Sequence, residues 1–304
     1  MTNKRIGIFL LITFLFSWMY EFVIVRGMMM GTFGELGAAS VQLAIAPVMF
    51  FPAIAVVITR LITKEGLEHA TLAPVRMKGT LKWWLVAWFA PSILILLGAA
   101  AYFFIYAEDF DPALTAFTTM IGSTGGTDMG VHQLVLIQIL TALFAAPLLN
   151  FFVCFGEEWG WRGYLLPKML ENHNIVTTLL VTGVVWGLWH APLIAMGHNY
   201  GFGYWGFPFT GILMMCAFCL VVGVFNSFVT IKSGSCIPAD LAHGSINGMA
   251  SVGVIFSVTG GNPFVGPAAT GIVGGMGLLI AALVMLTVLI KQEREGESFL
   301  TLFK

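Results

Sequence analysis

Eight long apolar runs, separated by short polar segments, make up most of this chain. Each run has about the 20 predominantly apolar residues that a helix needs to cross a membrane. The pattern predicts an all-α fold: a polytopic membrane helix bundle of about eight transmembrane helices, forming one transmembrane domain over residues 1–304. The expected spans are approximately 6–25, 41–62, 83–106, 134–156, 175–195, 209–230, 236–257 and 270–290.

The basic residues of the connecting segments predict how the bundle is oriented. If the N-terminus is in the cytoplasm, Arg26 is the only Lys or Arg in the expected outer segments. This excess of basic residues on the inner side is what the positive-inside rule requires. An even number of crossings then puts the C-terminus inside as well, so the expected topology is N-in and C-in. The inner segments contain Lys4, Arg5, Arg60, Lys64, Arg76, Lys78, Lys82, Lys168, Lys232, Lys291, Arg294 and Lys304.

Composition agrees with a membrane protein. Of the 304 residues, 58% are hydrophobic and 10% charged, whereas a soluble domain carries about 25% charged residues. We therefore expect an integral, multi-pass protein of the cell membrane with membrane lipid around it. The net charge of −1 gives no basis for a nucleic-acid partner. Cys216 and Cys219 form a CxxC inside an apolar run, which indicates packing because a redox thiolate needs an exposed site.

A few ionisable residues fall within or next to the expected spans. Such residues are costly in a membrane and are functional candidates by default. The alternative is that they pair with one another and only hold helices together. The set is Glu21, Glu157, Glu158, Arg162, His190, Asp240 and His243.

The sequence EEWGWR places two carboxylates beside a guanidinium. Glu158 and Arg162 are four residues apart, so they share one helix face and can form an ion pair. Glu157 is turned about 100° away and can face a cavity. This division predicts a structural role for the pair and a chemical role for Glu157.

The sequence VVWGLWHAP in the following span contains Trp186 and His190 on one face. Glu157 and His190 are equally distant from the expected turn near residues 171–174. Because such residues lie side by side in an antiparallel hairpin, we expect these two at similar depth.

A third group, in PADLAHGSINGMA, consists of Asp240, His243 and Asn247 at spacing i, i+3, i+7, on one helix face. This span begins soon after Lys232, so we expect His243 and Asn247 in the inner half of the membrane, in a cavity open to the cytoplasm. Alone, a His–Asn pair would more often be an interhelical hydrogen bond.

Together these side chains predict hydrolysis of a peptide bond. A carboxylate and an imidazole, Glu157 and His190, can take a proton from a water that attacks a carbonyl. An imidazole and an amide, His243 and Asn247, can donate hydrogen bonds to the oxyanion that forms. Zinc is an alternative, because Glu157, His190 and His243 could bind it with one open position. HExxH is absent and the scheme works without metal, so we expect no cofactor.

The three motifs, EExxxR, aromatic-xxx-His and HxxxN, resemble the type II CAAX prenyl endopeptidases within the wider group of CAAX proteases and bacteriocin-processing (CPBP, or Abi) membrane proteases, often labelled metalloproteases. They occur in the family's order within residues 154–250. The resemblance implies that Glu157 and His190 activate water, that His243 and Asn247 stabilise the oxyanion, and that Glu158 and Arg162 support the site. The second motif of the family usually begins with Phe, whereas this sequence has Trp186 at that position. Asp240 is outside the motifs, and either orients His243 or is a solvent-facing filler.

The expected function is thus an intramembrane endopeptidase that cuts near the C-terminus of a membrane-associated or prenylated peptide or lipidated protein. One alternative is an ion-coupled transporter, which also uses buried carboxylates and histidines. No repeated halves of the kind found in many transporters are present. Another is a non-catalytic membrane scaffold or bacteriocin-immunity protein.

Overall fold

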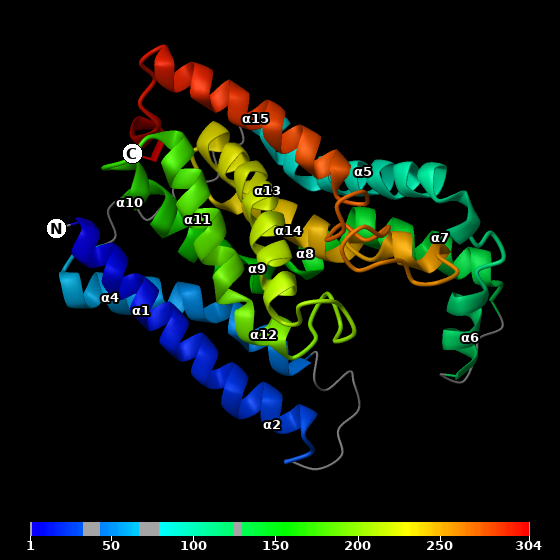
Figure 1. Cartoon of the computed structure of the whole chain (residues 1–304). Helices are drawn as coiled ribbons and strands as arrows, with labels where there is room; N and C mark the ends of the chain where they lie inside the picture. Colours follow the sequence, from blue (N-terminus) through cyan, green and yellow to red (C-terminus); the bar gives the residue numbers. More distant parts are fainter. Residues whose placement is uncertain (1, 33–42, 67–78, 124–128, 304) are drawn as a thin grey trace.

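The chain is almost entirely helical in the computed structural model, which describes residues 2–32, 43–66, 79–123 and 129–303 (Figure 1). The β pairing within those ranges is a single bridge between Phe110 and Ser257. The predicted all-α class is confirmed. The α-helices are α1 (Thr2–Tyr20), α2 (Arg26–Met29), α4 (Phe51–Thr63), α5 (Leu81–Ile105), α6 (Thr115–Ser123), α7 (Val131–Leu140), α8 (Ala146–Leu149), α9 (Phe151–Gly160), α10 (Leu166–Leu170), α11 (Ile175–Trp189), α12 (Ala191–Ala195), α13 (Phe209–Ser233), α14 (Ile237–Met249) and α15 (Met276–Arg294).

Short π-helical and 3₁₀ segments connect several of these helices. The π-helical segments are Glu21–Val25, Thr141–Ala145 and Trp161–Leu165. The 3₁₀ segments are Ala46–Phe50, Ala107–Asp109, Val252–Phe256 and Phe299–Phe303. The segment Trp161–Leu165 begins three residues after Glu158. Because π-bulges are frequent at functional sites, it marks this part of the chain as a candidate site.

Within the described residues, six helices are long and apolar enough to cross a membrane: Thr2–Met29, Leu43–Thr63, Leu81–Ile105, Val131–Leu149, Phe209–Ser233 and Met276–Arg294. The expected spans 175–195 and 236–257 contain the shorter helices α11 and α14, of 15 and 13 residues. The expected number of eight spans therefore stays a prediction, as does the N-in, C-in orientation. Arg76, Lys78 and Lys304 of the expected inner segments lie outside the described residues.

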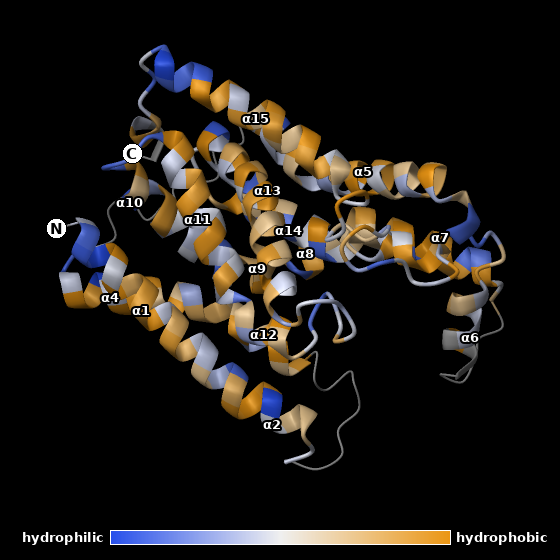
Figure 2. Ribbon diagram, viewed as in Figure 1, coloured by the Kyte–Doolittle hydropathy of each residue, from blue (hydrophilic) through white to orange (hydrophobic). Residues whose placement is uncertain are grey.

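One end of the bundle carries most of the charge, and we call it the basic end. There Glu65, just after α4, accepts from Arg5 of α1 at 3.3 Å and from Lys168 of α10 at 3.0 Å. Glu293 of α15 accepts from the backbone N–H of Ile175 at 2.7 Å, and Figure 2 shows hydrophilic residues at both chain ends there. The basic residues of this end are Lys4, Arg5, Arg60, Lys64, Lys82, Lys168, Lys232, Lys291 and Arg294.

Helix α13 is the centre of the bundle. In its span 61% of residues are buried, compared with 17% for α15, which faces outward. A glycine allows the close contact between α11 and α13, since a Cβ on Gly187 of α11 would lie 2.4 Å from the Cα of Cys216 of α13. Likewise, a Cβ on Gly156 of α9 would lie 2.5 Å from the carbonyl oxygen of Met49. These contacts fix α9 and α11 at the positions where they present the candidate site.

The opposite end of the bundle is held together by Asp109. Its carboxylate accepts hydrogen bonds from the hydroxyls of Tyr102, Ser257 and Thr259, at 3.0, 2.6 and 2.8 Å. The segment after α5 is thereby tied to the segment after α14.

Candidate active site

The adjacent carboxylates of α9 point to different neighbours, as their spacing predicts. Glu158 is fully buried and Glu157 is 2% exposed. Oε1 of Glu158 accepts from Nη1 of Arg162 at 3.0 Å, so the predicted ion pair is confirmed. Glu157 Oε2 accepts instead from the indole N–H of Trp186, at 2.7 Å. The two acids of one motif therefore serve two different groups of side chains.

Glu158 also reaches the third motif. The same Oε1 atom accepts from Nδ1 of His243 at 2.8 Å and from Nδ2 of Asn226 at 3.0 Å. Glu158 thus accepts three hydrogen bonds, two of them from the cationic Arg162 and the ionisable His243. Such charge-assisted hydrogen bonds are strong in a low-dielectric interior, so Glu158 holds these side chains in place. Asn226 of α13 was missed in the sequence, although a lone amide in the apolar run VVGVFNSF was a usable signal.

Asp240 does not hydrogen-bond to His243, so it does not orient that imidazole. Its carboxylate is fully buried, so the solvent-facing alternative is wrong, and neither of its oxygens has a hydrogen-bond partner among the described residues. Asp240 shares a face of α14 with His243, but the imidazole Nδ1 turns toward α9, where the charged oxygen of Glu158 lies 2.8 Å away. The residue that orients His243 is therefore Glu158.

Trp186 connects the motifs physically. Its indole hydrogen-bonds Glu157, the guanidinium carbon of Arg162 lies 4.1 Å from its ring centroid, and its ring meets that of His243 edge-on at 5.4 Å. The Arg162 contact is a cation–π interaction. An indole N–H supplies a donor that a Phe at this position would lack, so the departure at Trp186 adds a hydrogen bond to the site.

The two histidines have defined tautomers. Nδ1 of His190 lies 2.8 Å from the carbonyl oxygen of Trp186, and Nδ1 of His243 contacts a carboxylate. Because both partners only accept, each Nδ1 must carry the proton. In each neutral ring Nε2 is then the nitrogen left to accept a hydrogen bond, for example from water.

A cavity of about 520 Å³ brings the predicted catalytic residues together: Glu157, His190, His243 and Asn247 all line it. Trp186 lines it too, whereas Glu158, Arg162 and Asp240 lie behind its wall. Sequence reasoning missed several polar lining residues, because they lie in the turns and bends between helices, where helical spacing gives no signal. These are Asn150, His198, Asn199, Ser251 and Thr270.

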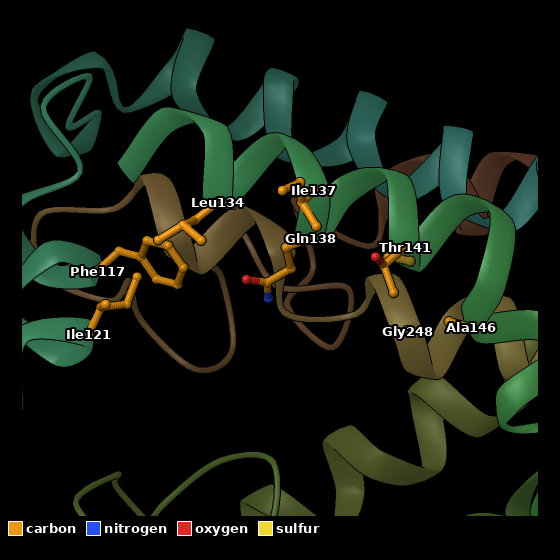
Figure 3. A pocket seen from close by; sticks show the side chains of 9 residues that line it. Phe117, Ile121, Leu134, Ile137, Gln138, Thr141, Ala146 and Gly248 are labelled. Atoms are coloured by element: carbon orange, nitrogen blue, oxygen red, sulfur yellow. The ribbon is translucent and has the colours of Figure 1, made fainter. Parts of the chain in front are cut away.

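A second cavity, of about 390 Å³, lies between α6, α7 and α14 and is almost wholly apolar (Figure 3). Gln138 and Thr141 are its polar residues, and no predicted site residue lines it. It offers no acid or base for chemistry, so the first cavity is the candidate site.

The donor set does not fit a metal ion well. In the described parts of the chain, no three His, Cys, Asp or Glu side chains gather in a group that could hold one. We therefore derive no step through zinc.

Known proteins are similar in the same region. The family model described as Type II CAAX prenyl endopeptidase Rce1-like matches residues 137–249. A curated protein of Methanococcus maripaludis, CAAX prenyl protease 2, is 28% identical over 92 residues, which are 30% of this chain and 34% of that protein. The chain thus matches about a third of that relative's length. The resemblance to the type II CAAX prenyl endopeptidases is confirmed, and it lies in the region that contains every predicted site residue.

Proposed function

We propose that this chain is an intramembrane endopeptidase that hydrolyses a peptide bond near the C-terminus of a membrane-associated or prenylated substrate. The observation that carries the proposal is the cavity in which Glu157, His190, His243 and Asn247 meet. The substrate is a peptide or lipidated protein with its lipid in the bilayer, and the enzyme is a multi-pass protein of the cell membrane with both chain ends in the cytoplasm.

In the first step Glu157 and the free Nε2 of His190 hold a water against the scissile carbonyl. As the water oxygen bonds to the carbonyl carbon, its proton passes to the Glu157 carboxylate. Trp186 holds one oxygen of that carboxylate by its 2.7 Å hydrogen bond, which leaves the other oxygen for the water. Glu157 is therefore positioned as the general base.

In the second step the carbonyl oxygen becomes an oxyanion. The amide of Asn247 donates a hydrogen bond to it, and so does Nε2 of His243 when that ring is doubly protonated, with its Nδ1–H on Glu158. One such donor is worth about 3–4 kcal/mol in the transition state. When the intermediate collapses, the C–N bond breaks and Glu157 returns its proton to the leaving amine.

The test is cleavage of a quenched fluorescent prenylated peptide by purified protein, with and without chelator. Glu157→Gln, His190→Ala and His243→Ala are each expected to lower the rate by about 10²-fold or more. Glu171→Gln, the same change at an exposed acid, serves as the matched control. Cleavage at the wild-type rate by Glu157→Gln would refute the proposal, and transport without cleavage would support the rival transporter.

A further inference from the structure

Asn150 is a polar residue of the cavity wall that the proposed chemistry does not use. It lies in the bend between α8 and α9, is partly exposed, and lines the cavity together with His243 and Asn247. A side-chain amide has a donor nitrogen and an acceptor oxygen, and the two ends of this one serve different purposes.

The nitrogen of the Asn150 amide ties two helical segments together. Nδ2 donates to the carbonyl oxygen of Ala146 at 3.0 Å and to that of Gly244 in α14 at 3.4 Å. Because both neighbours only accept, the nitrogen must face them, and both of its N–H groups are used. Among the described residues no donor contacts Oδ1. Oδ1 is therefore a free acceptor on a residue of the cavity wall.

Asn150 packs against the helix that carries both proposed oxyanion donors. Gly244 directly follows His243 and lies three residues before Asn247, so it is within one helical turn of each. A Cβ on Gly244 would lie 3.3 Å from the Cβ of Asn150, so the glycine lets the two segments approach closely. The free oxygen thus belongs to the same wall of the cavity as the oxyanion donors.

The backbone of a bound peptide has the donor that Oδ1 lacks. In an extended chain each residue points its own N–H and C=O to the same side, as the paired residues of an antiparallel ladder do. When His243 and Asn247 receive the scissile carbonyl oxygen, the N–H of the same residue points toward the wall that holds Asn150. We infer that Oδ1 of Asn150 accepts this N–H and so positions the substrate residue whose carbonyl is attacked.

This inference rests on the proposed function and adds a specificity to it. A substrate residue without an N–H, such as proline, leaves Oδ1 without its partner and is disfavoured at that position. The substrate class is then a peptide with an extended backbone and a secondary amide directly before the residue that is cut.

The test compares two substrates that differ in this N–H. In the quenched prenylated peptide an α-hydroxy acid replaces the amino acid that supplies the scissile carbonyl, so an ester oxygen takes the place of the N–H and the scissile amide is unchanged. We expect wild-type kcat/KM to be about 3–10-fold lower for this ester peptide, which is the range of one net hydrogen bond. Asn150→Leu has no acceptor and is expected to lose this difference. Products are identified by mass, so that only cleavage of the amide is counted.

Two controls isolate the hydrogen bond. A second ester peptide carries the ester one residue earlier, where the N–H points to the opposite side, and its kcat/KM relative to the amide peptide should be the same in wild type and Asn150→Leu. Asn172→Leu makes the same change at an exposed turn residue and should discriminate as wild type does. Asn150→Leu also loses the contacts of Nδ2, so its melting temperature is measured, and Asn150→Ala, which adds no atoms, replaces it where Leu is not accommodated.

The outcomes separate the inference from the proposed function. A folded Asn150 variant that keeps the wild-type preference for the amide peptide would overturn the inference. So would a wild type that discriminates equally against the two esters, a comparison that needs no variant. Complete loss of cleavage by folded variants would exceed the effect of one hydrogen bond and would also overturn it. If wild type cuts none of the peptides, the proposed function itself is rejected, and the inference with it.

Discussion

Removing the charge of Glu158 should be the most damaging conservative change in the protein. Glu158→Gln keeps the volume but leaves the guanidinium of Arg162, which is 3% exposed, without its counter-ion. Breaking a buried ion pair on one side costs about 3–5 kcal/mol, and a hydrogen bond to a charged group is worth about 1.5–3 kcal/mol. Because the three donors share a single oxygen atom, these figures do not add. We expect the free energy of unfolding to fall by about 4 kcal/mol.

The assay is thermal unfolding of the purified protein in detergent. One kcal/mol shifts the melting temperature of a chain of this order of size by about 2–4 °C, so Glu158→Gln should melt about 10 °C lower. Glu171→Gln is the control, since Glu171 also pairs with a cation, Lys168 at 3.1 Å, but at an exposed position worth less than about 1 kcal/mol. If the two variants melt within a degree or two of each other, the buried network around Glu158 is not formed as described.

Three further changes test other parts of the structure. Gly156→Ala should lower both melting temperature and peptide cleavage, because the added Cβ would lie 2.5 Å from the carbonyl oxygen of Met49 and push α9 from its place; wild-type values for both would contradict that contact. Burial raises the pKa of Asp109, but hydrogen bonds from Ser257 and its neighbours outweigh this and hold the pKa below its ordinary value. Asp109 therefore stabilises the fold above about pH 4, and this contribution is lost as pH falls through the lowered folded-state pKa, so melting of Asp109→Asn should depend less on pH in that acidic range. Glu21 is fully buried, and within the described ranges neither of its oxygens has a hydrogen-bond partner, so Glu21→Met should raise stability by about 1–3 kcal/mol; a lower melting temperature would show that the carboxylate has a partner.

The sequence could predict the fold class and the membership of the site because both depend on local patterns. Apolar runs separate spans from loops, and the spacing of Glu158 and Arg162 fixes their shared face without any tertiary information. The number of spans stays a prediction, since α11 and α14 have only 15 and 13 residues, and α11 is separated from α12 at the single residue His190. Asn226 could be noticed as a lone amide in an apolar run, but its partner Glu158 could not be predicted, because only packing brings α13 to α9.

The relative positions of α9 and α11 along their axes could not be predicted from the sequence alone. Equal distance from the turn predicts that Glu157 lies beside His190, yet its carboxylate binds Trp186, one helical turn closer to the turn. The π-helical segment Trp161–Leu165 lies between Glu157 and the turn. A π-bulge takes up an extra residue without lengthening the helix by a full step. The bulge therefore brings Glu157 closer to the turn by about 1.5 Å, which is part of the offset, and the length of the Trp186 side chain spans the rest.

The depth of His243 was hard to predict for a related reason, and the cavity open to the cytoplasm stays a prediction. The distance in sequence to Lys232 measures depth only if the connection between α13 and α14 lies at the membrane surface. In the structure Ser233, Ser235 and Cys236 of that connection are buried, at 6%, 2% and 0% exposed. Helix α14 therefore starts inside the protein, and seven residues from Cys236 bring His243 to the carboxylate of Glu158. The nearest charge in sequence measures depth only where the chain returns to the surface between helices.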